Sequence, residues 1–337
     1  MAAIIFFPIL ISFFVVLFML PLWIRKARQI GLVWEDMNKY EAPKVSGSGG
    51  VVTILGFMIG VFAYIAYQVF IVRETNITLF EALALSTVIL LLTGIGFMDD
   101  LMGWRKGGLS RRSRIILVLI AAIPLMAINV GKSKVLLPFI GILDLGIFYP
   151  LLMIPLGIVG ATMAFNIIAG CNGLEAGQGI LLISALGIVA YITGTPWLAI
   201  IAGCMVAALL AFMTYNFYPA RVFPGDSLTY ALGGLIAIIS ILGDFEKIAL
   251  FFFIPYILEA LLKIRGKLIK HSFGKPLPDN TLDLPYEKFY SINHIAIAAM
   301  KKISIRPTER RVVLSIWIFQ LIIIILGFII FKEGLFE

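Results

Sequence analysis

Charged residues are scarce in this sequence, and so are the residue types that build the commonest soluble catalytic sites. Asp, Glu, Lys and Arg make up 14% of the 337 residues, and there are two cysteines and two histidines. Cys171 and Cys204 are too few for a disulfide framework and lack metal-ligand spacing. His271 and His294 are not part of any Ser–His–Asp arrangement, and the chain has no Walker loop or kinase signature. These absences exclude serine hydrolases, P-loop nucleotidases and protein kinases.

Apolar residues are abundant and occur in long continuous runs. They make up 61% of the chain, and the mean hydropathy is +1.04, which excludes an ordinary soluble protein. Such runs favour spanning helices over the alternating segments of about ten residues that form a barrel. The first run, residues 2–24, has no basic n-region and is too long for the apolar h-region of a signal peptide, so we expect a retained helix. The predicted fold class is an all-α polytopic membrane protein.

Apolar windows of about 20 residues predict ten transmembrane helices. The predicted spans lie near residues 2–24, 49–71, 80–98, 115–130, 149–167, 179–194, 197–215, 228–243, 247–264 and 312–331. The fourth span is short, and Pro196, Gly203 and Pro255 are positions where a kink or break is expected. We expect a single integral-membrane domain over residues 1–337, with a cytoplasmic appendage loop at about 265–310.

The basic residues indicate the orientation of these helices. Loops that follow odd-numbered spans hold 22 of the 27 Lys and Arg residues, and the loops and ends on the other side hold five. The positive-inside rule therefore assigns the odd-numbered side to the cytoplasm and both termini to the outside. The net charge of +8 is accounted for by this bias. Because no basic soluble module is present, we expect no nucleic-acid partner.

Three polar motifs lie at the ends of predicted spans, all on the cytoplasmic side. The motifs are GFMDD, with Asp99 and Asp100; NIIAGCNGLEAGQG, with Asn166, Asn172 and Glu175; and NFYPARVFPGD, with Asn216, Arg221 and Asp226. Each motif alone has an ordinary interpretation: a solvated helix end, a flexible turn, or an N-cap. Their meeting at one membrane surface favours a functional site, since carboxylates near a membrane are costly.

The residue types in these motifs suit phosphoryl transfer. Carboxylates beside amide oxygens are the ligands that Mg²⁺ prefers, and this ion is commonly shared with substrate phosphates. Arginines supply bidentate phosphate contacts, and glycine turns at helix starts offer N–H groups to anions. Catalysis of phosphoryl transfer consists mostly of positioning and charge neutralisation.

In their order and spacing, the motifs resemble those of the polyprenyl-phosphate N-acetylhexosamine-1-phosphate transferases. The resemblance covers most of the chain and includes DMNK at residues 36–39 and YEKF at residues 286–289. It is strongest with the eukaryotic and archaeal UDP-N-acetylglucosamine:dolichyl-phosphate branch. It implies ten spans, a cytoplasmic site, and transfer of N-acetylglucosamine 1-phosphate to a polyprenyl phosphate, with release of UMP. The implied cofactor is Mg²⁺, with Mn²⁺ as a substitute.

The resemblance also assigns roles to individual residues. Asn166 and Asp226 match the metal ligands, and Phe223 matches an aromatic residue that stacks on uracil. The catalytic candidates are Asp99, Asp100, Arg112 and Arg114. The substrate-binding candidates are Lys44, Gly170, Asn172, Glu175, Arg221, Phe223, Lys270, His271 and Lys275. A surface role is the alternative for Lys270, His271 and Lys275. Because a lipid phosphate is already largely dianionic at neutral pH, we expect the acidic pair to position a basic residue and the diphosphate.

Several alternatives stay open at this stage. Bacterial relatives that act on muramoyl-pentapeptide donors carry aspartates where this chain has Ala169 and Asn172, which favours the N-acetylglucosamine branch. Another UDP-hexosamine donor, a transporter of phosphorylated substrates and an inactive scaffold are the other hypotheses. The expected partners are a UDP-sugar, a polyprenyl or dolichyl phosphate, membrane lipids and a second copy in a homodimer. An archaeal protein of this kind would lie in the plasma membrane.

Overall fold

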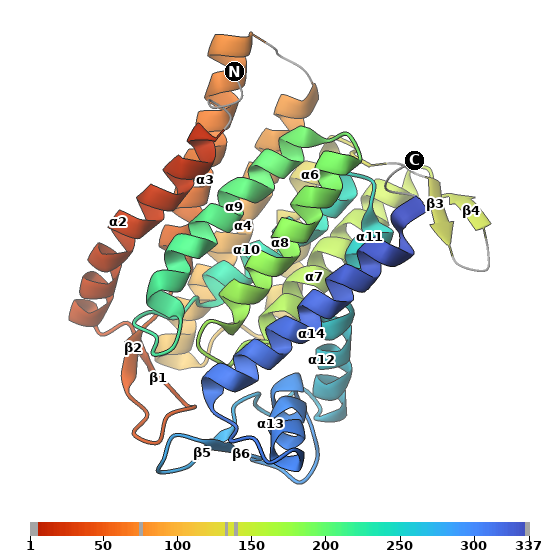
Figure 1. Ribbon diagram of the computed structural model, residues 1–337. Helices are drawn as coiled ribbons and strands as arrows, with labels where there is room; N and C mark the ends of the chain where they lie inside the picture. Colours follow the sequence, from red (N-terminus) through yellow and green to blue (C-terminus); the bar gives the residue numbers. More distant parts are fainter. Residues whose placement is uncertain (1–5, 74–76, 132–133, 138–140, 334–337) are drawn as a thin grey trace.

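The protein is a bundle of long helices with short connections, shown in Figure 1. This computed structural model describes residues 6–73, 77–131, 134–137 and 141–333. The helices are α2 (Phe7–Ile30), α3 (Gly50–Tyr67), α4 (Ile77–Lys106), α5 (Arg111–Ala121), α6 (Ile123–Ala127), α7 (Ile154–Ile167), α8 (Leu174–Ile192), α9 (Pro196–Asn216), α10 (Asp226–Leu242), α11 (Glu246–Phe252), α12 (Ile254–Arg265), α13 (Ile292–Lys302) and α14 (Glu309–Ile330). Two π-helical turns, η1 (Gln68–Val72) and η2 (Tyr149–Met153), extend α3 and precede α7.

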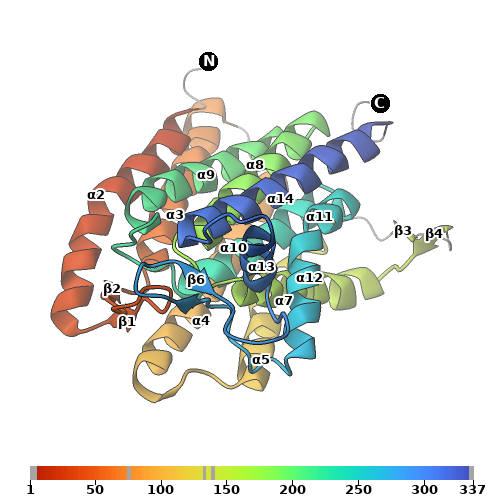
Figure 2. The same ribbon diagram turned by 60° about the horizontal axis from the view of Figure 1, so that its bottom comes forward.

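Three antiparallel hairpins complete the described structure. They are β1 (Val33–Glu35) with β2 (Lys44–Ser46), β3 (Lys134–Leu137) with β4 (Gly141–Asp144), and β5 (Lys275–Pro276) with β6 (Leu282–Asp283). Figure 2 shows that the first and third hairpins gather with α13 at one end of the bundle, beside the last turns of α4. This end of the bundle therefore carries most of the polar loops.

Seven helices in the described part of the chain are long and apolar enough to cross a membrane, as expected for a polytopic membrane protein. They are Phe7–Ile30, Gly50–Val72, Thr78–Trp104, Tyr149–Ile167, Leu174–Ile192, Pro196–Asn216 and Glu309–Ile330. Each coincides with a predicted span, and α10 is a shorter apolar helix at the predicted span 228–243. The helical, membrane-type fold predicted from composition is thus confirmed.

The two remaining predicted spans are each divided into two helices. The span 115–130 is divided between α5 and α6 at Ala122, and the span 247–264 between α11 and α12 at Phe253. In both places a proline, Pro124 or Pro255, occupies the start of the second helix, where its missing N–H group is tolerated. Gly203, in contrast, lies within the uninterrupted helix α9. A break at Pro255 is therefore confirmed, and one at Gly203 was wrong.

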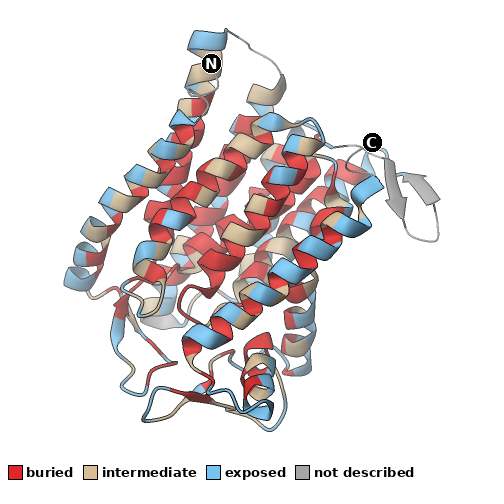
Figure 3. Cartoon of the chain, viewed as in Figure 1, coloured by how far each residue is buried: buried red, intermediate tan, exposed pale blue. Residues whose placement is uncertain are grey.

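Helix α10 lies in the middle of the bundle and packs against α4, α7, α3 and α8. Every residue from Ser227 to Ile241 is buried. A helix that is apolar all round is stable only when other helices surround it. Figure 3 shows the buried residues concentrated along these inner helices, with exposed residues on the outer faces of α2 and α14. The position of α10 fixes the position of Asp226, its first residue.

Gly96 allows α4 to approach the start of α10 closely. A Cβ atom at Gly96 would lie 2.3 Å from the carbonyl oxygen of Asp226 and 2.6 Å from the amide nitrogen of Ser227. A Cβ atom at Gly94, two residues earlier in the same helix, would meet nothing within 4 Å. The two glycines therefore form a matched pair, one in contact with α10 and one free of neighbours.

We expect Gly96→Ala to destabilise the protein by about 1–3 kcal/mol, because overpacking forces α4 and α10 apart. Gly94→Ala should leave stability unchanged or raise it slightly, since alanine is the better helix former. Thermal unfolding of both variants in detergent would check this. Equal melting temperatures for the two variants would contradict the close contact between α4 and α10.

Candidate active site

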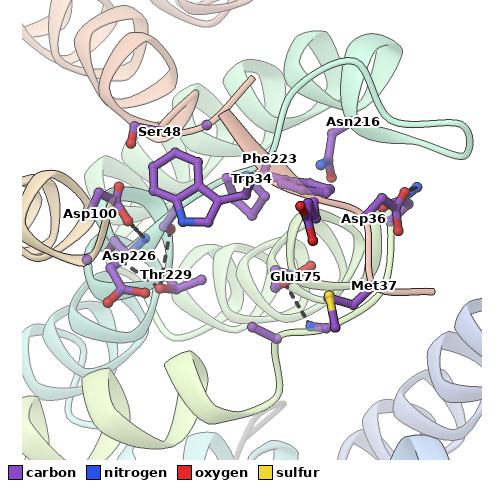
Figure 4. A pocket seen from close by; sticks show the side chains of 18 of the residues that line it. Trp34, Asp36, Met37, Ser48, Asp100, Glu175, Asn216, Phe223, Asp226 and Thr229 are labelled. Atoms are coloured by element: carbon purple, nitrogen blue, oxygen red, sulfur yellow. Dashed lines mark hydrogen bonds between the residues drawn. The ribbon is translucent and has the colours of Figure 1, made fainter. Parts of the chain in front are cut away.

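A cavity of about 640 Å³ opens among the loops at this end of the bundle, as Figure 4 shows. Its walls come from the end of α4 and from four loops: those between α2 and α3, between α7 and α8, before α10, and between α12 and α13. Among the residues predicted from sequence, those lining it are Asp100, Gly170, Asn172, Glu175, Phe223 and Asp226. Three motifs that are distant in sequence therefore meet at one cavity.

Asp100 joins the end of α4 to the first turn of α10. Its Oδ1 accepts a hydrogen bond from the backbone N–H of Asp226 at 2.7 Å, and its Oδ2 accepts one from Ser227 at 3.4 Å. Gly225 has φ of 72° and leaves space for this carboxylate, because a Cβ atom there would lie 2.3 Å from Asp100 Oδ2. A carboxylate at these N–H groups satisfies donors that the helix itself leaves free.

Asp99 points to a different set of partners. Its Oδ2 lies 2.5 Å from Arg114 Nε and accepts a hydrogen bond from the hydroxyl of Tyr230 at 3.2 Å. Its Oδ1 accepts from Arg114 Nη2 at 3.0 Å and from the backbone N–H of Leu109 at 2.7 Å. Arg114 Nη2 in turn lies 4.0 Å from Asp226 Oδ2. Asp99 therefore holds the guanidinium of Arg114 near the carboxylate of Asp226.

Asn166, at the end of α7, is in direct contact with Asp226. Its side-chain amide nitrogen donates to Asp226 Oδ1 at 2.7 Å and to Thr229 Oγ at 2.9 Å. Within the described residues, no group of three or more His, Cys, Asp or Glu side chains forms a metal-binding cluster. Mg²⁺ would take the oxygen atoms of this pair, Asp226 Oδ2 and Asn166 Oδ1, because the amide nitrogen cannot ligate a cation, and it usually completes its shell with water and substrate phosphates.

The loop between α7 and α8 is fixed by two buried carboxylates. Glu175 Oε1 accepts from the backbone N–H of Gly170 at 3.2 Å, and Glu309 Oε1 accepts from that of Asn172 at 2.8 Å. The side-chain amide of Asn172 donates to Asp36 Oδ2 at 2.9 Å. Glu175 thus both lines the cavity and holds the loop in place.

The structure adds cavity residues that the sequence candidates did not include. They are Trp34, Asp36, Met37, Ser48, Trp104 and Phe273, among others. Asp36 and Met37 belong to the DMNK motif, so the signal for that segment was present in the sequence although none of its residues was selected. Trp34 and Ser48 belong to no such motif.

Besides Asp99, Arg114 and Asn166, six predicted residues lie outside the cavity walls. They are Lys44, Arg112, Arg221, Lys270, His271 and Lys275, and all are exposed. The ammonium group of Lys270 lies 4.7 Å from the ring centroid of Tyr286. The His271 ring stacks on Phe273, with centroids 6.1 Å apart, and so contacts a residue that lines the cavity.

The segment between α12 and α14 is held by a second buried polar network. Glu259 Oε2 accepts from the N–H of Ile292 at 2.7 Å, at the start of α13, and Lys263 Nζ donates to Ser272 Oγ at 2.6 Å. His294 accepts through Nδ1 from Tyr290 and contacts the carbonyl of Phe273 through Nε2. Burial lowers the pKa of His294, so the ring is neutral at physiological pH.

The fold and the cavity define a polytopic helical membrane protein with a carboxylate-rich site at one end of its bundle. Residues 82–244 match the family model described as glycosyl transferase family 4. A Saccharolobus solfataricus protein, provisionally named as a UDP-N-acetylglucosamine–dolichyl-phosphate N-acetylglucosaminephosphotransferase, is 35% identical over 95% of each chain. The chain belongs to glycosyl transferase family 4.

Two further relatives show how wide the likeness is. The UDP-N-acetylglucosamine–dolichyl-phosphate N-acetylglucosaminephosphotransferase of Dictyostelium discoideum is 30% identical over 70% of this chain and 65% of its own length. A phospho-N-acetylmuramoyl-pentapeptide-transferase of Halalkalibacterium halodurans is 31% identical over 77% of this chain and 84% of its own length. The relatives therefore include proteins named for two different donors.

Proposed function

We propose that this protein transfers N-acetylglucosamine 1-phosphate from UDP-N-acetylglucosamine to dolichyl phosphate. An oxygen of the lipid phosphate attacks the β-phosphorus of the nucleotide-sugar, and the bond from that phosphorus to the bridging oxygen breaks. UMP leaves, and a dolichyl diphosphate sugar forms. The likeness to the Saccharolobus protein over 95% of each chain is the observation that carries this proposal.

The contacts around Asp226 support a phosphoryl-transfer site. Asn166 and Asp226 would hold a Mg²⁺ ion, which supplies neutralisation of diphosphate charge when bound. Arg114, fixed by Asp99 and 4.0 Å from Asp226, places a second positive charge beside that position. Negative charge builds up on the oxygen of the leaving UMP as its bond to the β-phosphorus breaks, so fixed cations lower the barrier.

The other end of the cavity suits the nucleotide. Phe223 offers an aromatic face for the uracil ring, and Gly170 lies in the same wall of the cavity, where its missing Cβ leaves room for Ser272. Asn172 has its amide nitrogen committed to Asp36, so its oxygen is the atom that would accept from the base. The donor is thereby aligned with its diphosphate toward Asp226.

A muramoyl-pentapeptide donor is the second candidate, since the Halalkalibacterium relative is named for it. The contact between Asn172 and Asp36 favours the first candidate. An aspartate at position 172 would place a second carboxylate about 2.9 Å from Asp36 Oδ2, where like charges repel. The neutral amide therefore suits this chain better than the aspartate found in the muramoyl branch.

The proposal includes ten spans, with both termini outside and the cavity in the cytoplasm. The bias of 22 basic residues against five supports this orientation. Under this topology residues 265–310 form a cytoplasmic appendage of one membrane domain.

Purified protein given UDP-N-acetylglucosamine and dolichyl phosphate should release UMP in a reaction that stops when EDTA removes divalent cations. In a panel that keeps the acceptor fixed, UDP-N-acetylgalactosamine and the muramoyl-pentapeptide donor should react at least about tenfold more slowly. Release of UMP would be followed together with formation of the lipid product. Transport of the nucleotide-sugar into vesicles without turnover would reverse the proposal in favour of a transporter.

We expect Asp99→Asn to lower kcat by about 100-fold, because Arg114 loses its charged partner and moves. The acidic limb of the pH–rate profile should remain, since Asp99 positions Arg114 and is not a general base.

Asp226→Ala should cost about 10²–10³ in rate and also weaken activation by Mg²⁺. Glu287→Gln, at an exposed site in the appendage, is the control. Loss of the acidic limb in Asp99→Asn, with Mg²⁺ activation unchanged, would indicate a base instead.

Orientation can be measured with single cysteines, because Cys171 and Cys204 are both buried. In right-side-out vesicles a membrane-impermeant maleimide should label Lys247→Cys directly. It should label Lys288→Cys only after permeabilisation. Both positions are exposed, so the difference reports the side of the membrane. Labelling of Lys288→Cys in sealed right-side-out vesicles would overturn the cytoplasmic assignment.

A further inference from the structure

A buried ion pair lies just outside the cavity and belongs to none of the roles described above. Lys39, in the DMNK segment, contacts the Oε2 atom of Glu309 at the start of α14 and lies 3.1 Å from Asp36 Oδ2. Lys39 is 8% exposed and Glu309 is 1% exposed. Neither residue lines the cavity, so neither is placed to touch a ligand within it.

The pair contacts the loop between α7 and α8 on one side. Glu309 Oε1 accepts from the backbone N–H of Asn172 at 2.8 Å, and the Asn172 amide donates to Asp36 at 2.9 Å. Asp36, Lys39, Glu309 and Asn172 thus form a closed ring of contacts, which we call the latch. The latch fixes the DMNK segment against the central loop, and both segments line the cavity.

Neighbouring contacts extend the latch to the two remaining loops of the cavity. The ammonium group of Lys39 lies 4.2 Å from the ring centroid of Tyr218, in the α9–α10 loop that carries Phe223. Asn38, beside Lys39, donates to the carbonyl of Gly170 and accepts from the N–H of Gly274 at 3.0 Å. All four loops therefore contact the latch or the residue next to it.

Stability alone does not explain why two charges are buried here, because an apolar pair of similar volume is often at least as stable. Here the carboxylate of Glu309 offers two acceptor oxygens, one for Lys39 and one for Asn172, and no apolar side chain could serve both. Burial acts to lower the pKa of Lys39, but Glu309 and Asp36 outweigh it and the pKa is raised. Lys39 therefore remains charged throughout the physiological pH range.

We propose that Lys39 and Glu309 are positioning residues that set the affinity of the cavity for the nucleotide half of the donor. They act through Asp36, Met37 and the Gly170–Asn172 segment. This inference rests on the proposed function, in which these segments face the uridine. The carboxylates Asp100 and Asp226 are held by α4 and α10 and do not depend on the latch. Disturbing the latch should therefore raise KM for the nucleotide-sugar and leave kcat nearly unchanged.

The test uses three variants of the full chain. Lys39→Met leaves Glu309 and Asp36 buried without their cation, and should raise KM for UDP-N-acetylglucosamine by about 10- to 100-fold. Glu309→Gln keeps an acceptor for Asn172 and should raise KM by only about 3- to 10-fold. The double variant Lys39→Met/Glu309→Gln removes both charges, so its KM should lie below that of Lys39→Met. In all three, kcat should stay within about threefold of the wild-type value.

A matched control breaks a similar pair elsewhere. Lys301→Met removes an ion pair in which Lys301 Nζ lies 2.6 Å from Asp283 Oδ1. The two side chains are 48% and 36% exposed, so the variant should change neither KM nor kcat. If Lys39→Met fails to fold, Glu309→Gln and the double variant still carry the test.

Calorimetric binding of UMP to the detergent-solubilised protein separates the two possible failures. Wild-type protein that binds no uridine nucleotide would overturn the proposed function. Wild-type binding with equal UMP affinity in the three latch variants would overturn the latch alone. A fall in kcat with KM unchanged would also contradict it, because the effect would then lie at the reacting phosphates.

Discussion

The carboxylate of Asp100 ties the last turns of α4 to the first turn of α10, and the geometry of the cavity depends on this contact. It accepts hydrogen bonds from two N–H groups that α10 cannot satisfy itself. Gly96 and Gly225 allow the approach because they have no Cβ atom. Since α10 is buried along nearly its whole length, the position of Asp226 is set by the helix bundle and not by a loop. Side chains on rigid elements are held more tightly than side chains on loops.

Adjacent residues on a helix point about 100° apart, and this explains how Asp99 and Asp100 serve different partners. Asp100 reaches backbone N–H groups of α10, whereas Asp99 reaches Arg114 and Tyr230. Asp100 therefore holds α4 and α10 together at the site, and Asp99 places the guanidinium of Arg114 in it. A pair that looks symmetrical in the sequence is thus divided in the structure, because each carboxylate has its own set of partners.

The helical membrane fold and the meeting of the three motifs could be predicted from sequence, because apolar length and the one-sided distribution of charge are local signals. The latch could not be predicted in this way. Lys39 and Glu309 are 270 positions apart, and each resembles an ordinary loop or first-turn residue. Lys44, Arg112 and Arg221 were predicted as site residues from the family resemblance, and the structure places all three outside the cavity walls with exposed side chains.

Helices α8 and α10 begin at the cavity and α14 begins behind the loop between α7 and α8, and each has an acidic residue in its first turn. These residues are Glu175, Asp226 and Glu309, and each carboxylate contacts a neighbouring loop or helix end. An anionic side chain at a helix start is favourable because the N-terminal end carries partial positive charge. At α10 this partial charge lies beside Asp226, where the proposed site has the diphosphate of the donor. The helix starts thus offset part of the negative charge of these carboxylates, which would otherwise repel an anionic substrate.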